Sequence, residues 1–408
     1  MSFGAGIIGM FAANYLQRSG LKVTVLDAVA PGRSCSFGNA GALSSGSCVP
    51  LAMPGVLRQL PKWLTDDMGP LVLSWRYLPR ALPWLWQFAK ASRPDAVERS
   101  ADALIALTWP LFENLMPLVA EARAERFIQR VGQLHVYSTE AAFQGDRLAI
   151  DLRRRRGVTV EVLAPEEIRQ LEPALAPIFK RAVWFPDHGH CANPFALVEA
   201  LAGTFRSNGG QILARRVLDI EFNADGPHTV VTDAGPMPIE TLIVAAGAWS
   251  HRLASKLGHT VPLETQRGYH ALLPDPNVAP RRNVQWSERK FIAAPMETGL
   301  RFAATVELAC LDAPPNYRRA DKLLEQGREM FPGLVGGEIN RWMGHRPCLP
   351  DSMPVIGRST HVEDLFCFRP WPHWAHLRRD HRPPDCRSCH RPKALCRPVL
   401  RVSIILAS

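Results

Sequence analysis

The sequence predicts an α/β protein built around a Rossmann-type dinucleotide-binding unit. Two observations support this prediction: glycines spaced as G-x-G-x-x-G at Gly4, Gly6 and Gly9, and a helical pattern over 8–18 that leads into an alternating strand ending at Asp27. With 408 residues, 47% of them apolar, the chain is long enough for two or three packed units. This composition excludes a disordered or collagen-like protein.

Each position of the glycine fingerprint has a physical role in holding a dinucleotide. Gly4 permits the tight turn after the first strand, Gly6 lets the backbone approach a pyrophosphate, and Gly9 lets the helix pack on the strand. The N-terminus of the helix, at Ile7 and Ile8, then faces the phosphates. The alternative is a glycine-rich turn that holds no ligand.

Two features flank the fingerprint. Asp27 lies 18 residues after Gly9 at the end of the second strand, where its carboxylate can accept a hydrogen bond from a ribose hydroxyl. Only residues 1–3 precede Gly4, so we expect a shortened first strand, and with it either a start further upstream or a destabilised product.

A glycine-rich polar loop follows this strand. Ser36 and Asn39 supply hydrogen-bonding groups, while Gly38 and Gly41 allow a close backbone approach. The loop, which includes Ala40, is therefore suited to lie flat against a cofactor. An ordinary surface loop is the alternative.

The net charge of +10 is concentrated at one end of the chain. Residues 368–408 hold nine Arg and Lys against two Asp, which accounts for +7. A nucleic-acid-binding surface places its cations along one face or groove, so we expect no nucleic-acid partner. Neither a secretion signal nor an apolar stretch long enough to span a membrane is evident, which predicts a cytoplasmic protein with free thiols.

Five motifs occur in a fixed order: the glycine fingerprint, then SFGNAG at 36–41, VAAGAWS at 244–250, QRGYH at 266–270 and WMGHRPCLPD at 342–351. Together they resemble the flavin-dependent D-amino-acid oxidase superfamily, and within it most closely the small subunit of bacterial D-amino-acid dehydrogenases. The resemblance extends from Gly4 to about Cys367. It implies a glutathione-reductase-like FAD-binding domain, a second α+β substrate domain, FAD as the cofactor, and oxidation of D-amino acids through an imine to 2-oxo acids and ammonia.

The resemblance also implies where the domains lie. The FAD-binding domain is discontinuous and takes 1–50, 186–262 and 351–367, and the substrate domain takes 51–185 and 263–350. Elements expected between the motifs are helices over the whole of 95–130, a strand at 181–185, a helix at 195–208 and strands at 211–217 and 241–247.

The substrate side of the site centres on Arg346. A guanidinium binds a carboxylate through two parallel hydrogen bonds, and this position matches the carboxylate-binding arginine of the superfamily. A surface arginine is the alternative. Tyr269 and His270 are candidates to line the substrate pocket, and Arg267 to pair with a carboxylate.

On the cofactor side, the resemblance places Val217 beside the adenine, and Gly247, Trp249 and Gly357 beside the FAD. Hydride passes from the substrate α carbon to flavin N5 without the need for a protein base, and the electrons leave to a quinone or another acceptor. Three alternatives remain: an inactive relic of the enzyme, a related oxidoreductase for glycine, sarcosine or D-hydroxyproline, and a basic-tailed binding protein.

Three further segments have two possible interpretations each. The prolines in the segment 50–88 exclude one long helix there. The segment also contains Trp63, Trp75, Trp84 and Trp86. These tryptophans either cover the core of the substrate domain, or they contact an electron-accepting partner or the inner face of the plasma membrane. The basic run 153–156 is expected at a helix C-terminus rather than on a nucleic acid. His188 and His190 lack a third ligand at a defined spacing, so we expect no metal site.

From residue 368 the sequence departs from the superfamily. Back-translation from Arg369, read from the second base of each codon, can spell GHGHTGLTSGATTGRLIADLV, a glycine-histidine loop followed by an amphipathic helix as the superfamily implies. We therefore expect 368–408 to be an out-of-frame, disordered tail. Its Cys386-Arg-Ser-Cys389-His390 pattern, typical of haem attachment or zinc, then has no function.

Overall fold

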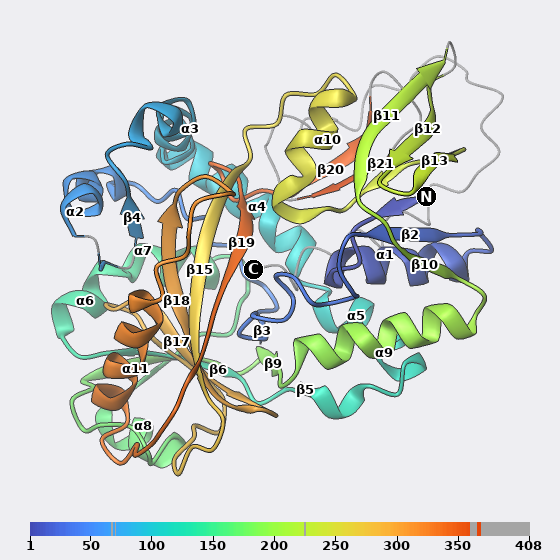
Figure 1. Cartoon of the computed structure of the whole chain (residues 1–408). Coiled ribbons are helices and arrows are strands. Elements are labelled where there is room, and N and C mark those ends of the chain that lie inside the picture. The colour runs from blue at the N-terminus through green and yellow to red at the C-terminus, as the bar shows by residue number, and fades with distance from the viewer. Residues whose placement is uncertain (67, 70, 224–225, 360–364, 369–408) are drawn as a thin grey trace.

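The computed structural model describes residues 1–66, 68–69, 71–223, 226–359 and 365–368. Two large sheets organise these residues: a six-stranded sheet on the side of the N-terminus and a nine-stranded sheet on the other side (Figure 1). The predicted out-of-frame tail lies outside the described residues, apart from Phe368. The α/β class expected from the fingerprint is the observed one.

Distant segments of the chain form the six-stranded sheet, in the order β10-β2-β1-β14-β21-β20. Its strands are β1 (Ser2–Phe3), β2 (Thr24–Asp27), β10 (Gln211–Ala214), β14 (Ile243–Val244), β20 (Val355–Arg358) and β21 (Leu365–Phe368). Neighbouring strands are parallel, except for the antiparallel pair of β20 and β21. Although β1 has only two residues, it pairs with both β2 and β14 in the middle of the sheet.

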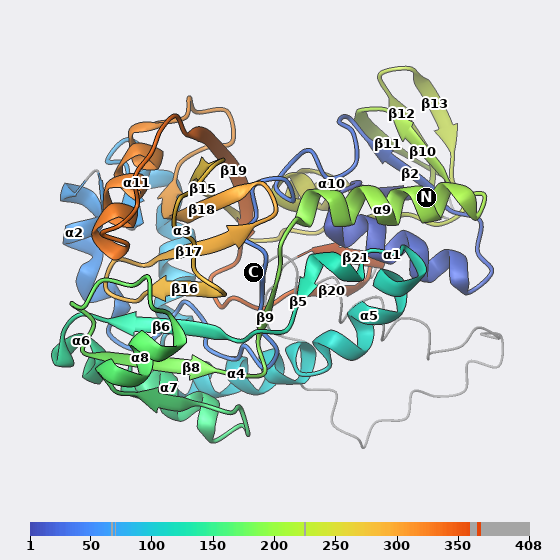
Figure 2. The same ribbon diagram turned by 90° about the horizontal axis from the view of Figure 1, so that it is seen from below.

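The two faces of this sheet are covered by different elements. On one face lie α1 (Ile7–Arg18) and α9 (Pro194–Ser207), which run side by side in Figure 2. The other face packs against α10 (Ser250–Lys256) and a small antiparallel sheet of β11 (Val217–Asn223), β12 (Gly226–Thr232) and β13 (Gly235–Pro238). Consecutive residues of β2 therefore enter different cores: Val25 packs under the helices and Leu26 packs on the opposite side.

Two sequence predictions are wrong in this region. The strand expected over 211–217 is two strands, because β10 pairs with β2 only as far as Ala214 opposite Asp27, and the chain then turns into β11. Helix does not continue to residue 130: α4 (Pro94–Thr108) and α5 (Leu111–Glu121) are followed by Arg123, whose φ of 52° ends the helical path. The short helix η2 (Glu125–Phe127) and strand β5 (Ile128–Gln129) come next.

The nine-stranded sheet has the order β19-β15-β18-β17-β16-β6-β8-β7, with β4 paired to β18. Its strands are β4 (Leu71–Leu73), β6 (Gln133–Tyr137), β7 (Glu161–Leu163), β8 (Arg181–Phe185), β15 (Glu264–Leu273), β16 (Asn283–Trp286), β17 (Phe291–Met296), β18 (Gly299–Leu308) and β19 (Asn340–Cys348). The helices α8 (Pro165–Leu171) and α11 (Arg318–Met330) cover one face. A third sheet, β3-β9-β5, contains β3 (Ala42–Leu43) and β9 (Gly189–Cys191).

The proline-rich segment is broken into short elements, as its composition predicts. It contains η1 (Val56–Gln59), α2 (Leu60–Thr65), β4 and α3 (Leu78–Ala91). Its tryptophans divide into two groups, since Trp63 and Trp84 are buried in a local core while Trp75 and Trp86 are 63% and 62% exposed.

The basic run lies at the end of α7 (Arg147–Arg154), which follows α6 (Glu140–Gly145), so its expected place at a helix C-terminus is confirmed. One helical stretch, Pro94–Glu121, is long and apolar enough to cross a membrane by length and composition. This differs from the expectation that no stretch is long and apolar enough to span a membrane. Apolar side chains such as Val97, Leu104 and Leu115 are buried in the protein core, and 39% of the most apolar window is buried.

Candidate active site

A large cavity extends from the glycine fingerprint to the nine-stranded sheet. Its volume is 1530 Å³, which exceeds the roughly 300 to 1,000 Å³ of a site for one small molecule and suits a dinucleotide together with a substrate. Both large sheets line it, and so does the segment after β3.

The fingerprint glycines are packed as a dinucleotide turn requires. Gly4 has a φ of 104°, and a Cβ there would lie 2.3 Å from the Ala245 carbonyl oxygen. A Cβ on Gly9 would lie 1.8 Å from the Gly4 oxygen, so α1 can approach β1 only without a side chain. Gly6 differs: its nearest neighbour would be Ser36 Oγ at 3.6 Å, which leaves open space on the cavity side.

Side chains from β2 and the following loop fix this turn. Asp27 Oδ2 accepts a hydrogen bond from the Ala5 N–H at 2.7 Å, and Asp27 Oδ1 accepts one from Val29 at 3.0 Å. Ser36 Oγ accepts from the Ile7 N–H at 3.0 Å, at the start of α1. The carboxylate and the hydroxyl therefore lie at the cavity wall with their positions set by the backbone.

Three residue pairs of β15 and β19 face the polar loop. Their register pairs Gln266 with Arg346, Gly268 with Gly344, and His270 with Trp342. Because side chains on a strand alternate between faces, the two glycines leave a flat surface between the larger pairs.

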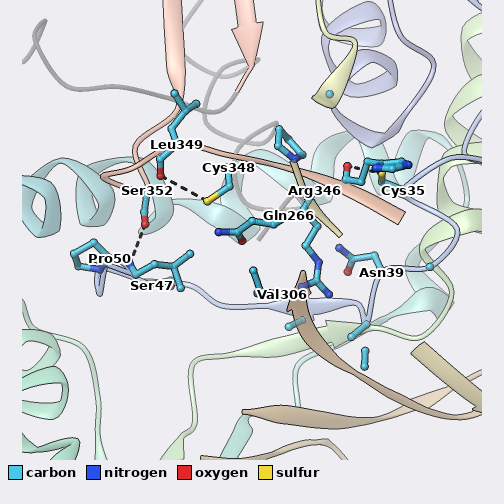
Figure 3. Close-up of a pocket in the computed structure, with 18 of the residues that line it drawn as sticks. Cys35, Asn39, Ser47, Pro50, Gln266, Val306, Arg346, Cys348, Leu349 and Ser352 are labelled. Carbon is cyan, nitrogen blue, oxygen red and sulfur yellow. Dashed lines mark hydrogen bonds between the residues drawn. The ribbon is translucent and has the colours of Figure 1, made fainter. Parts of the chain in front are cut away.

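The large side chains lie over that flat surface. A Cβ on Gly268 would lie 2.5 Å from Arg346 Cζ, and one on Gly344 would lie 2.0 Å from the Trp342 ring. Gly38 of the loop meets the same ring, where a Cβ would be 2.1 Å away. Figure 3 shows the Arg346 side chain extending into the cavity. Its guanidinium is thus held over a glycine at the cavity wall.

The opposite face of β15 holds a separate ion-pair network. Arg267 is 1% exposed, lies 3.3 Å from Glu307, and donates to the Ala313 carbonyl at 2.9 Å. Tyr269 donates to Glu307 at 2.6 Å, and burial, together with this carboxylate, raises its pKa to about 12. These two predicted substrate contacts therefore bind a carboxylate of the protein, away from the cavity lining.

His270 lies behind the cavity wall as a neutral ring. It is 2% exposed, stacks on Trp342 with ring centres 5.1 Å apart, and donates from Nδ1 to the Gly38 carbonyl at 3.1 Å. Burial lowers its pKa to about 3. The ring thus connects the substrate sheet to the polar loop.

The polar loop itself is held from behind. Asn39 Oδ1 accepts from the Gly41 N–H at 2.7 Å, and Arg301 of β18 donates to the Asn39 carbonyl. Gly41 has a φ of 67°, and a Cβ there would lie 2.1 Å from the Cys191 carbonyl oxygen, so the loop packs closely on β9.

The predicted site residues divide into two sets. Those lining the cavity are Gly4, Gly6, Ile7, Ile8, Asp27, Ser36, Asn39, Ala40, Val217, Gly247, Trp249 and Arg346. Those placed away from its lining are Gly9, Gly41, Arg267, Tyr269, His270 and Gly357. Gly357 lies within β20, opposite Phe366 of β21.

Sequence reasoning missed several lining residues near Arg346. Gln266, Trp342 and Val306 surround the guanidinium side of the cavity, and His345 stands edge-on to Trp249 with ring centres 5.4 Å apart. A signal for Gln266 was present, because residues 266, 268 and 270 share one strand face and 267 and 269 share the other.

Comparisons with known proteins agree with this geometry. Residues 3–375 match the family model described as FAD dependent oxidoreductase, DAO. The chain belongs to this FAD-dependent oxidoreductase family. It is 37% identical over 371 residues to a D-amino-acid oxidase of Bradyrhizobium diazoefficiens, covering 89% of this chain and 87% of that protein. It is 31% identical to a D-amino acid dehydrogenase of Paramagnetospirillum magneticum, with 89% and 88% covered.

Solved structures show the same fold. Glycine oxidase from Bacillus cereus superposes with a TM-score of 0.68 at 18% identity, covering 99% of this chain and 93% of that one. The family match over residues 3–375 makes the chain a flavoprotein oxidoreductase with FAD as its cofactor. The residues present fit FAD: the Gly4 and Gly9 packing forms the turn, Gly6 is open toward the cavity, and Asp27 ends β2.

Proposed function

We propose that this flavoprotein oxidises D-amino acids through an imine to 2-oxo acids and ammonia. The observation that carries the proposal is Arg346, a guanidinium presented over Gly268 into the cavity that begins at the glycine fingerprint. The names of its relatives, D-amino-acid oxidase and D-amino acid dehydrogenase, support the same substrate class.

In the proposed reaction, Arg346 binds the substrate carboxylate through two parallel hydrogen bonds and so fixes the α carbon. Gln266, paired with Arg346 across the strands, adds an amide to the same wall. FAD, when bound, accepts the α hydrogen with its electron pair as a hydride. Water then hydrolyses the imine to the 2-oxo acid and ammonia.

The charges around the cavity favour a mechanism without a protein base. Among the described lining residues, the carboxylates are Asp27, at the dinucleotide turn, and Asp146, which accepts a hydrogen bond from Tyr137 at 3.0 Å. The histidines that line the cavity, His135 and His345, have pKa values lowered by burial and are therefore weak bases. The amine therefore enters in its neutral form and loses hydride directly.

For the electron acceptor we propose a quinone or similar carrier, met at the inner face of the plasma membrane. The support is the outer surface around α3, where Trp75, Leu82 and Trp86 are exposed beside basic residues. Lys90 Nζ lies 3.2 Å from the centre of the Trp86 ring, so a cation and an aromatic group meet on one surface. Such a combination is typical of contact with an anionic lipid interface.

A substrate and acceptor panel tests the proposed function. FAD-loaded protein is assayed for 2-oxo acid formation with D-amino acids, their L enantiomers, glycine and sarcosine, and with either oxygen or a soluble quinone. We expect turnover of D-amino acids above all others, and a higher rate with the quinone. Preferential turnover of glycine or sarcosine would support the related amine oxidoreductase instead, and an FAD-loaded protein without turnover would support the inactive relic.

A further inference from the structure

A second cationic region lies in the same cavity, in a part that the proposed reaction does not use. It comes from the basic run 153–156, whose four arginines have different surroundings. Arg155 and Arg156 pair with Glu98, and Arg156 also pairs with Asp102. Arg153 alone of these four lines the cavity.

Arg153 forms no salt bridge in the described part of the chain, although the Asp146 carboxylate, which lines the same cavity, acts on it electrostatically. Its Nη1 donates to the Ala149 carbonyl at 3.2 Å, and its Cζ lies 5.1 Å from the Phe185 ring centre. Burial lowers the pKa of this guanidinium by more than the neighbouring Asp146 carboxylate raises it. A half-buried cation that lines a cavity and forms no salt bridge stabilises an anion placed next to it.

Other donors surround the same place. Lys290, at the turn between β16 and β17, and His135 of β6 both line the cavity. Arg153 and Lys290 both act on His135 and, with burial, keep its pKa well below the ordinary value. The ring is therefore neutral and supplies an N–H donor.

Gln133 adds an amide to this group. Its Oε1 accepts from Ser44 at 3.1 Å and lies 3.1 Å from His188 Nδ1. The side chain is only 4% exposed and lines the cavity, so its amide nitrogen supplies N–H donors there. We call Gln133, His135, Arg153 and Lys290 the basic corner.

We propose that the basic corner is a second anion-binding site, which takes a small carboxylate. It does not depend on the reaction proposed above, because β6, which carries Gln133 and His135, is distant from β19, which carries Arg346. In the strand order, β6 is five steps from β19, which is about 24 Å along the sheet at about 4.8 Å per step. One small amino acid does not span that length, so the second carboxylate belongs to a separate molecule.

Titration of FAD-loaded protein with acetate at low ionic strength, followed by calorimetry, tests the site. We expect two acetates per chain in the wild type and one in Arg153→Met, with the lost site weakened at least tenfold. Arg154→Met is the matched control: this arginine is one residue further along α7 and exposed, and the variant should keep both sites. Arg153→Lys keeps the charge and should keep measurable binding.

The other arms separate the possible sources of the carboxylate. Arg346→Met should lose the acetate bound at Arg346 and keep the one at the basic corner. If a 2-oxo acid occupies the basic corner, pyruvate should bind with the same stoichiometry as acetate in each variant. A dicarboxylate long enough to cover about 24 Å, such as eicosanedioate, that binds one per chain and is weakened by either arginine variant would show one molecule spanning both sites and overturn the separate-ion proposal.

Two further results would also overturn it: two acetates in Arg153→Met, or a changed flavin spectrum in that variant with both acetate sites intact, which would assign Arg153 to the cofactor. If the wild type oxidises no D-amino acid, and Arg153→Met still binds one acetate fewer than the wild type, the proposed reaction is contradicted but the second anion-binding site is supported.

Discussion

At the scale of single residues, the account depends on Arg346 binding a carboxylate with two hydrogen bonds. Arg346→Lys keeps the charge but not the planar fork, so we expect KM to rise more than kcat falls. Loss of one charged hydrogen bond, roughly 1.5 to 3 kcal/mol, lowers kcat/KM about ten- to a hundredfold. Steady-state kinetics with a D-amino acid check this, and the flavin spectrum should not change.

Arg341→Lys is the control for that variant. Arg341 lies on the same strand but forms a surface ion pair with Asp321 at 2.6 Å, so its replacement should leave kcat/KM unchanged. Wild-type kinetics in Arg346→Lys would remove Arg346 from the substrate site.

The second residue-scale prediction concerns Gly38, where the polar loop meets the Trp342 ring. In Gly38→Ala the new Cβ would lie 2.1 Å from that ring, so either the loop or the tryptophan must move. We expect a loss of about 1 to 3 kcal/mol in the free energy of unfolding, together with weaker FAD retention. Denaturant unfolding and flavin release on gel filtration measure the two effects.

Gly203→Ala serves as its control. This glycine lies within α9, and a Cβ there meets no atom within 4 Å, so the variant should gain about 0.5 to 1 kcal/mol from helix propensity. Equal stability changes in the two variants would argue against close packing at Gly38.

At the scale of elements, strand alternation decides which motif residues reach the cavity. The QRGYH motif identifies β15, but the sequence alone does not say which face of it looks toward the fingerprint. The chemistry of Arg267 and Tyr269 makes them candidates for the substrate pocket. Both lie instead on the face of β15 that is covered by the loop before α11, where Glu307 binds them. Glu307 is 40 residues away in sequence, and only the β15–β18 register brings it there.

The turn after β19 gives a prediction for pH dependence. Asp351 is 1% exposed, and burial raises its pKa from 3.8 to about 7. Between these values the folded state holds a proton that the unfolded chain has released, so the free energy of unfolding falls as pH rises through this window and levels off above it. A pKa difference of about three corresponds to about 4 kcal/mol.

Asp351→Asn removes this titration while its Oδ1 can still accept from the Met353 N–H. The variant should match the wild type near pH 4 and exceed it in stability at pH 8, by denaturant unfolding at each pH. Asp312→Asn changes an 85% exposed carboxylate and should not alter the profile. If the free energy of unfolding of Asp351→Asn falls with pH as steeply as that of the wild type and of Asp312→Asn, the assignment to Asp351 is contradicted.

The surface around α3 gives a second element-scale prediction. Trp86→Ala should weaken binding to vesicles of anionic phospholipid several-fold in a sedimentation assay, because it removes an exposed aromatic group next to Lys90. Phe222→Ala, which removes an aromatic that is 46% exposed on β11, should leave binding unchanged. Equal binding of wild type and Trp86→Ala would remove this surface from the proposed membrane contact.

At the scale of the whole molecule, local patterns predicted the cofactor side better than the substrate side. The fingerprint, its helix and Asp27 are neighbours in sequence, and their turn is fixed by local sterics at Gly4 and Gly9. The substrate wall brings together β15, β18 and β19 with the distant loop at Gly38, through pairings that no local pattern encodes. The same reason explains why the sequence predicts Arg153 at a helix end but does not indicate that it lines the cavity.

The central claim is that the cavity binds FAD and presents a D-amino acid to it with its carboxylate on Arg346. Anaerobic mixing of FAD-loaded protein with a D-amino acid, followed by flavin absorbance and 2-oxo acid analysis, tests it most directly. The account predicts bleaching of the oxidised flavin with one 2-oxo acid formed per flavin, and no bleaching with the L enantiomer. Flavin that stays oxidised with every D-amino acid tried, or that is bleached equally by both enantiomers, would contradict it.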